Sequence, residues 1–191
     1  MTENESVKKA GTVNLPQILC HILFVAILVL VDQITKYWVR NQFMDGGDIP
    51  LIPGVFRIVF HKNDGAVWGL LSGKNNAVIF LSIMTVIILF VIIFLYIRIP
   101  KTRHYFPLVI ISLFVISGAI GNFIDRTLFG YVTDFLYIEL INFPVFNIAD
   151  CYITISIFII FILMLTYYRN DEMEFLSLKK KSQAGEQDGE K

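Results

Sequence analysis

Three aspartates interrupt the apolar stretch SGAIGNFIDRTLFGYVTDFLYIELINFPVFNIADCYI, residues 117–153: Asp125, Asp134 and Asp150. Ionised side chains beside strongly apolar segments are rare unless they are paired or take part in function. The stretch therefore raises two questions, namely what surrounds it and why three carboxylates lie so close together.

The composition of the whole chain indicates a membrane protein. Of its 191 residues, 55% are hydrophobic and 14% are aromatic, which is more apolar than an ordinary soluble domain. The formal net charge is zero, so no basic field favours nucleic acid as a partner. We expect membrane lipid to surround the chain, and the position of each charge along the sequence then becomes the informative quantity.

Four segments are long enough to cross a membrane as helices. Each lacks Asp, Glu, Lys and Arg, and they are residues 10–31, 75–97, 105–124 and 151–168. A span needs about 20 apolar residues to cross a hydrocarbon core of about 30 Å. We therefore expect an all-α membrane protein with four transmembrane helices, near residues 15–38, 75–97, 104–124 and 146–168.

The basic residues predict which side of the membrane each loop faces. Lys and Arg gather in four places, residues 8–9, 98–103, 169 and 179–181. Cytoplasmic loops carry such an excess of positive charge. We expect both termini in the cytoplasm, residues 1–169 as a single membrane-embedded domain and residues 170–191 as a polar cytoplasmic tail. The loops 39–74 and 125–145 then face outward.

The first outer loop carries strand and turn signals. Residues 55–60 are rich in β-branched and aromatic side chains, and turns are predicted at 45–47 and 63–65. The second outer loop adds residues 130–134 as a further short strand. We expect a small extracytoplasmic β-cradle at the outer membrane boundary, with Trp68 near the level of the lipid headgroups.

Asp32 and Lys36 lie four residues apart, on one face of the first predicted helix. One interpretation is a structural ion pair at the end of a helix. The other is a functional site, because charged residues inside a span usually face the interior of the bundle. The pair by itself does not decide between the two.

Asp150 has a structural interpretation of its own. Pro144 precedes it, Asn147 is a good N-cap residue, and an aspartate in the first helical turn is favoured by the helix dipole. Helix capping does not explain why Asp134 and Asp125 reach the same side of the membrane within the same stretch.

Two carboxylates that meet in a poorly solvated site share a proton, because both cannot ionise easily. One carboxylate takes a proton from an attacking water, while its protonated partner polarises a peptide carbonyl and helps the amine to leave. We therefore interpret Asp134 and Asp150 as an aspartyl protease pair, supported by Asp125 and Arg126. The alternative for Arg126 is a plain salt bridge or an anchor to lipid headgroups.

The other common use of clustered carboxylates is metal binding. His61 is the only histidine in the predicted outer loops, and the chain contains no HExxH motif and no cysteine-rich ligand spacing. We therefore predict neither a metal site nor a cofactor.

Five ordered motifs resemble those of the lipoprotein signal peptidases, also called signal peptidase II, of bacterial cytoplasmic membranes. DQITK at 32–36 is similar to D-x-x-[ST]-K, and NDGAVWG at 63–69 to N-x-G-A-[AV]-[FW]-G. GAIGNFIDR at 118–126 is similar to G-A-x-G-N-x-x-D-R, VTDF at 132–135 to V-x-D-F, and FNIAD at 146–150 to F-N-x-A-D. Thr133 is a departure, since a second valine is frequent at its position.

The resemblance implies a function and a set of site residues. Asp134 and Asp150 would be the catalytic pair of an aspartyl endopeptidase that acts without a cofactor. The substrate would be a diacylglyceryl-modified prolipoprotein, cut just before its lipidated cysteine at the outer face of the membrane. The residues that would shape and hold the site are Asp32, Lys36, Asn63, Gly65, Asn122, Asp125, Arg126 and Asn147. We expect the enzyme to be a monomer.

Three alternatives remain. A transporter would use the carboxylates as proton or cation sites, although residues 75–97 contain few polar groups. A non-catalytic membrane scaffold would not need both Asp134 and Asp150. A presenilin-like intramembrane aspartyl protease is disfavoured, because no GxGD motif surrounds either of them.

Overall fold

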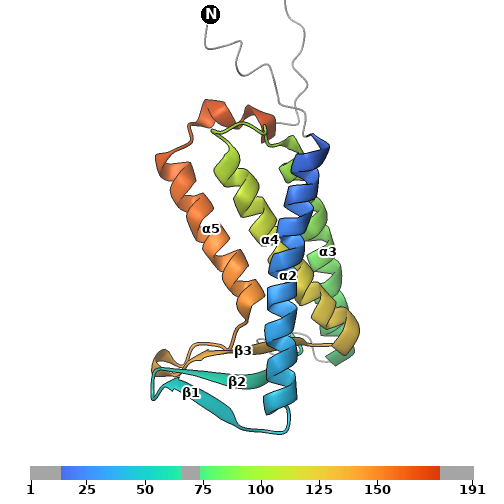
Figure 1. The fold of residues 1–191 in the computed structure, drawn as a ribbon, viewed down its shortest axis with the longest axis vertical. Helices are drawn as coiled ribbons and strands as arrows, with labels where there is room; N and C mark the ends of the chain where they lie inside the picture. Colours follow the sequence, from blue (N-terminus) through green and yellow to red (C-terminus); the bar gives the residue numbers. More distant parts are fainter. Residues whose placement is uncertain (1–13, 66–73, 177–191) are drawn as a thin grey trace, which may run out of the picture.

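The computed structural model describes residues 14–65 and 74–176. The expectation for Trp68, part of the motif at 63–69 and the end of the expected tail therefore lie outside the described residues. The described part is mostly helical and carries one small antiparallel sheet, which confirms the predicted fold class (Figure 1).

Within the described residues, four helices are long and apolar enough to cross a membrane, as the composition predicted. They are α2 (Leu15–Phe43), α3 (Lys74–Arg98), α4 (Phe106–Phe129) and α5 (Ile148–Thr166). The start of α2, the connection between α3 and α4, and the end of α5 lie at one end of the bundle, and the sheet lies at the other (Figure 1). We call the latter the sheet end.

Two of the helices extend further toward the sheet end than the sequence predicted. α2 continues to Phe43, beyond the expected end near residue 38, and α4 continues to Phe129, beyond residue 124. Asp125 and Arg126 therefore belong to the last turns of α4 and not to the loop 125–145. The prediction counted uncharged residues, whereas α4 ends only at Gly130, whose φ of 72° and N–H bond to the Arg126 carbonyl form a left-handed cap.

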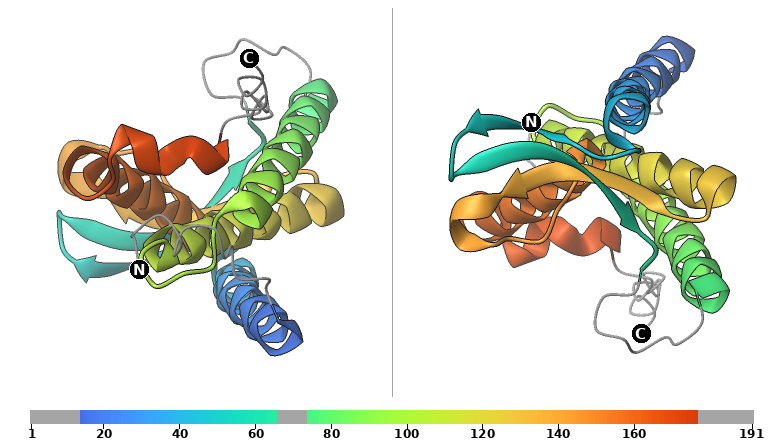
Figure 2. Two further views of the ribbon diagram at one scale, coloured as in Figure 1. Left: turned by 90° about the horizontal axis from the view of Figure 1, so that it is seen from above. Right: turned by 90° about the horizontal axis from the view of Figure 1, so that it is seen from below.

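The central helix is α4, which packs against α2, α3 and α5 (Figure 2). Many of its side chains are therefore buried, whereas α2, α3 and α5 keep large apolar side chains exposed along most of their length. Such exposure suits helices that are surrounded by lipid.

The sheet has three antiparallel strands in the order β1-β2-β3. They are β1 (Asp48–Ile52), β2 (Phe56–Asn63) and β3 (Val132–Ile138). The sequence predicted parts of β2 and β3 but missed β1, in which Pro50 weakens the strand pattern. β3 comes from the segment between α4 and α5, and its pairing with β2 places His61 opposite Asp134.

The beginning of the expected tail packs against the bundle at the end opposite the sheet. Asn170–Leu176 forms a short 3-10 helix, η2. The hydroxyl of Tyr105 donates to the Glu172 carbonyl at 2.8 Å, and Arg98 Nε donates to the Phe175 carbonyl at 2.7 Å. This part of the tail is therefore attached to α3 and to the start of α4.

Two glycines of α4 allow the helices to approach closely near the sheet end. A Cβ atom at Gly118 would lie 2.5 Å from the carbonyl oxygen of Ala149 in α5. A Cβ atom at Gly121 would collide with the carboxylate of Asp32 in α2. The spacing of the two glycines thus brings both neighbouring helices against the same part of α4.

We expect Gly118→Ala to lower the midpoint of thermal unfolding, because the added methyl group forces α4 and α5 apart. Overpacking of this kind costs about 1–3 kcal/mol. The measurement is thermal unfolding of the purified protein in detergent. Thr127→Ala is the matched control, since Thr127 is exposed on the same helix. An unchanged midpoint for Gly118→Ala would contradict the close packing of α4 and α5.

Candidate active site

One asparagine connects the two predicted catalytic aspartates. Asp134 lies on β3 and Asp150 in the first turn of α5. Asn147 Nδ2 donates to Asp134 Oδ1 at 2.6 Å, and the backbone N–H of Asn147 donates to Asp150 Oδ2 at 3.1 Å. The structure therefore brings together two carboxylates that come from different elements.

Asn147 can connect them because it is also the N-cap of α5. Its Oδ1 accepts from the backbone N–H of Asp150 at 3.0 Å, which completes a capping box with the bond to Asp150 Oδ2. The capping role predicted for Asn147 and Asp150 is confirmed. The cap uses the oxygen of the Asn147 amide, so the amide nitrogen remains available to donate to Asp134.

Asn63 holds the other oxygen of Asp134. Its Nδ2 donates to Asp134 Oδ2 at 2.8 Å from the end of β2. Its Oδ1 accepts from the backbone N–H of Gly65 at 3.0 Å, which fixes the orientation of the amide. Gly65 has a φ of 78°, and a Cβ there would collide with Leu81, so glycine suits this turn.

Lys36 lies at the centre of a buried layer behind the two aspartates. Its Nζ lies 2.9 Å from Asp32 Oδ2 and 3.7 Å from Asp125 Oδ2, and it donates to Asn122 Oδ1 at 2.9 Å. The side chains of Lys36, Asp32 and Asp125 are fully buried. The pairing of Asp32 with Lys36 on one helix face, predicted from their spacing, is confirmed.

Asn122 joins this layer to the aspartate pair. Its Nδ2 donates to Asp150 Oδ1 at 2.8 Å, while its Oδ1 accepts from Lys36 and, at 3.2 Å, from Asn147. Asp32 makes a second link, since its Oδ1 accepts from the backbone N–H of Ala149 at 3.0 Å. The start of α5 is therefore held by both α2 and α4.

Asp125 forms a hydrogen bond with β3, whereas Arg126 forms no ion pair with the carboxylates near it in the described part of the chain. Asp125 Oδ2 accepts from the backbone N–H of Thr133 at 2.8 Å. Arg126 is half-buried, and the charges of Asp150, Asp134 and Asp125 act on it. Within the described part of the chain, none of these carboxylates is within ion-pair distance of Arg126.

Three site residues were not predicted: Gln33, Arg40 and Thr133. Gln33 Nε2 donates to Asp32 Oδ2 at 3.0 Å and to the Gly121 carbonyl at 3.0 Å. Arg40 Nη1 donates to Thr133 Oγ1 at 2.8 Å. A signal for Arg40 was present, because it follows Lys36 by four residues and so shares the helix face of Asp32 and Lys36.

The pKa of Asp134 is raised to about 6, mainly by burial and secondly by the negative charge of Asp150. The hydrogen bonds from Asn63 and Asn147 and the charge of Lys36 act in the opposite direction. Asp134 therefore keeps its proton at a higher pH than an ordinary aspartate, as a general acid requires.

A groove of about 570 Å³ gives access to Asp134. It is bounded by the end of β2, by β3 and by the loop before α5. The residues that line it are His61, Lys62, Asn63, Asp64, Asp134, Tyr137, Asn142, Phe143, Pro144 and Val145. Asp134 lines this groove although it is only 1% exposed.

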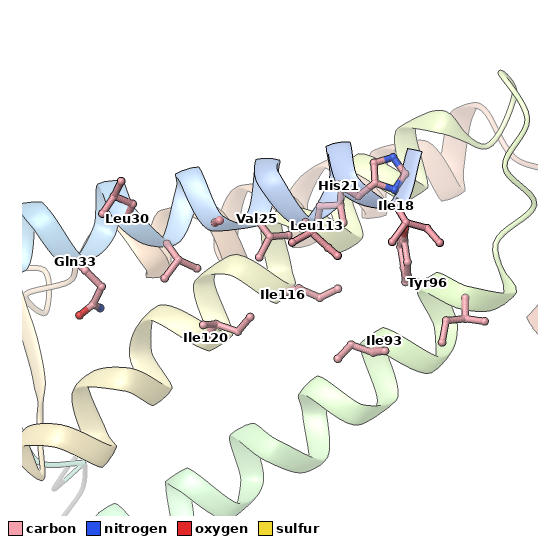
Figure 3. Close-up of a pocket in the computed structure, with 14 residues that line it drawn as sticks. Ile18, His21, Val25, Leu30, Gln33, Ile93, Tyr96, Leu113, Ile116 and Ile120 are labelled. Atoms are coloured by element: carbon pink, nitrogen blue, oxygen red, sulfur yellow. Dashed lines mark hydrogen bonds between the residues drawn. The ribbon is translucent and has the colours of Figure 1, made fainter. Parts of the chain in front are cut away.

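A larger hollow of about 850 Å³ lies away from the aspartates, between α2, α3 and α4 (Figure 3). Its walls are mostly aliphatic. His21 and Tyr96 share a hydrogen bond of 2.6 Å at one end of it, and Gln33 lies at the other (Figure 3). The smaller groove, and not this hollow, is lined by one of the predicted catalytic carboxylates, that of Asp134.

Known proteins are similar to this chain in sequence. The family model for Signal peptidase (SPase) II matches residues 24–167. Two relatives from Staphylococcus aureus, strains MRSA252 and JH9, bear the name lipoprotein signal peptidase. Each is 39% identical over 146 residues, covering 75% of this chain and 86% of the relative.

Two solved structures are similar in fold, and both are described as bacterial membrane enzyme structures obtained by the in meso method. The one at 1.9 Å resolution has a TM-score of 0.69 and 36% identity, and the match covers 79% of this chain and 96% of that one. The one at 2.3 Å has a TM-score of 0.64 and 33% identity, with coverage of 88% and 96%.

We expect Lys36→Met to destabilise the protein by roughly 3–5 kcal/mol, because two buried carboxylates lose their shared cation. Unfolding in detergent, followed by circular dichroism, measures the loss. Arg57→Met is the matched control. Arg57 pairs with Asp48 at 3.1 Å and Glu139 at 3.0 Å, but all three side chains are about one-third exposed. The loss there should stay below about 1 kcal/mol, and equal losses would contradict the central role of Lys36.

Proposed function

This chain belongs to the signal peptidase II family, and from that premise we propose that it is an aspartic endopeptidase of diacylglyceryl-modified prolipoproteins. It removes the signal peptide by cutting before the lipidated cysteine. One observation carries the assignment of catalytic type: Asn147 donates from its side chain to Asp134 and from its backbone to Asp150. That arrangement holds two carboxylates together beside an accessible groove.

The proposed reaction uses Asp134 and Asp150 as a pair that shares one proton. The ionised carboxylate takes a proton from water as the water attacks the scissile carbonyl carbon. The protonated carboxyl donates to the carbonyl oxygen and, later, a proton passes to the leaving nitrogen. The raised pKa of Asp134, about 6, favours Asp134 as the residue that carries the proton in the free enzyme.

Apart from Arg126, the other site residues act on the aspartate pair and not on the substrate. Asn63, Asn122 and Asn147 donate to the carboxylate oxygens and so fix their directions. The layer of Asp32, Lys36 and Asp125 holds α2 and α4 in register behind them. Arg126, on which both catalytic charges act, is left to contact the substrate or a lipid phosphate.

The position of the site suits a substrate anchored in the membrane. The pair lies where α5 begins, at the sheet end of four apolar helices. Arg98, Lys101 and Arg103 lie at the opposite end, which the positive-inside rule assigns to the cytoplasm. We propose that the pair acts at the outer face of the bacterial cytoplasmic membrane, with both termini in the cytoplasm.

A carboxylate-based transporter fits the arrangement less well. Transport would need polar groups at successive depths across the membrane. In the part of the chain that the structure describes, the buried Asp, Glu, Lys and Arg residues are Asp32, Lys36, Asp125 and Asp134, and all four lie toward the sheet end.

We expect the purified protein to cleave a diacylglyceryl-modified precursor and to leave the unlipidated precursor intact. Asp134→Asn and Asp150→Asn should each reduce cleavage by at least about 10³-fold, because neither variant can complete the proton transfers. Mass spectrometry of the products measures both the rate and the position of the cut.

Tyr137→Phe is the control variant, because Tyr137 lines the groove but its hydroxyl donates to Asn142 and not to either aspartate. It should cleave at close to the wild-type rate. Substantial cleavage by either aspartate variant would rule out the catalytic pair, and equal cleavage of both precursors would rule out lipid recognition.

We expect kcat/KM to fall as the pH rises through an apparent pKa of about 6, since the pair then loses its shared proton. Asn63→Ala should move this alkaline limb to higher pH. The lost hydrogen bond stabilised ionised Asp134, so its removal raises the pKa. The pH profile of kcat/KM, compared with that of Tyr137→Phe, measures the shift. If the alkaline limb of Asn63→Ala stays in place or moves to lower pH, the result contradicts a hydrogen bond from Asn63 to ionised Asp134.

A further inference from the structure

We propose that Arg40 is a positioning residue that fixes the strand carrying Asp134 against α2 and α4. The proposal rests on the proposed function, because its consequence is the placement of a catalytic group. Arg40 lies in the last turn of α2, and its side chain is only 11% exposed. A guanidinium that is nearly buried needs fixed partners, and Arg40 has three.

The partners come from two elements other than α2. Arg40 Nη1 donates to Thr133 Oγ1 on β3 at 2.8 Å and lies 3.5 Å from Asp125 Oδ1 on α4. The guanidinium carbon lies 4.2 Å from the ring centroid of Phe129, also on α4, within the range of a cation–π contact. Arg40 is therefore the point at which α2, α4 and β3 are tied together.

Thr133 is the residue through which Arg40 acts. It is fully buried and immediately precedes Asp134 on β3. Successive side chains of a strand point to opposite faces, so Thr133 points toward Arg40 and Asp134 toward Asn63 and Asn147. The strand is thus held from behind by Arg40 at the position next to the catalytic carboxylate.

Asp125 completes the attachment. Its Oδ2 accepts from the backbone N–H of Thr133 at 2.8 Å, and its Oδ1 faces Arg40. Arg40 and Lys36 together balance the two negative charges of Asp125 and Asp32 in this region. Without Arg40, the ion pair with Lys36 at 3.7 Å would be the one that Asp125 keeps. The hydroxyl of Thr133 would also lose the hydrogen bond from Arg40.

The effect expected from a loosened β3 is on the rate of the chemical step. Displacing a catalytic group by about 1 Å can reduce a rate by about 100-fold. Arg40→Met keeps the length and the apolar stem of the side chain but removes its donors and its charge. We expect kcat to fall by about 10-fold or more, with KM for the lipidated precursor within about twofold of wild type. Arg40→Lys should restore part of kcat because it keeps a cation and a donor.

The route through Thr133 is tested by a double-mutant cycle. Thr133→Val is nearly isosteric and removes only the hydroxyl that accepts from Arg40. If the two residues act as a unit, the loss in kcat for the double variant will not exceed that for Arg40→Met alone. If the fold-losses in kcat of the two single variants multiply in the double variant, Arg40 does not act through Thr133. If Arg40→Met does not fold, Thr133→Val tests this route alone: a lower kcat supports it, and a wild-type kcat overturns it.

Arg98→Met is the matched control. Arg98 also lies in the last turn of a long helix, but at the end opposite the sheet. Its guanidinium carbon lies 5.4 Å from the ring centroid of Phe94, and its Nε donates to the Phe175 carbonyl at 2.7 Å. It should leave kcat unchanged. Equal losses for the Arg98 and Arg40 variants would show a general effect on stability and overturn the proposal.

A measurement that does not depend on activity separates this proposal from the proposed function. Hydrogen–deuterium exchange of the peptide containing β3 should increase in Arg40→Met and stay at the wild-type level in Arg98→Met. If the wild-type chain fails to cleave the precursor, the proposed function fails, while the exchange result still decides whether Arg40 holds β3. Unchanged exchange, wild-type kcat, or an effect on KM alone overturns the proposal.

Discussion

The buried ammonium group of Lys36 imposes the constraint on which the sheet end of the molecule depends. A charge that is removed from water is tolerated only when other groups satisfy it fully. Lys36 reaches this state with Asp32 from its own helix and with Asn122 and Asp125 from α4. These contacts hold α2 and α4 in their observed register, and Gly121 lets the two helices approach closely enough to form them.

A second polar layer rests on the first and contains the proposed catalytic pair. The same amide of Asn122 that accepts from Lys36 donates to Asp150, and Asn147 connects Asp150 with Asp134. Helix capping satisfies backbone groups in the first turn of α5, and it also sets the position of Asp150 beside Asp134. The structure confirms the capping role of Asp150, and the catalytic role that we propose uses the same carboxylate.

The small sheet adds a polar groove to this end of the helical bundle. β3 supplies Asp134, β2 supplies Asn63, and the loop before α5 closes the groove beside them. The helices themselves offer mainly apolar walls, as the larger hollow between α2, α3 and α4 illustrates (Figure 3). Membership of the signal peptidase II family agrees with this division between a membrane anchor and a polar site at its edge.

The sequence by itself determined the four spans, the shared helix face of Asp32 and Lys36, and the capping pair Asn147 and Asp150, because these depend on local periodicity and on residues a few positions apart. Only the tertiary structure decided that α4 continues past Asp125, that Pro50 lies within a strand, and that Arg40 meets Thr133. These depend on partners that are distant in sequence, whose desolvation and hydrogen bonding outweigh local preference. The bond from Arg40 to Thr133 spans 93 positions of the chain, so no local pattern could have predicted it.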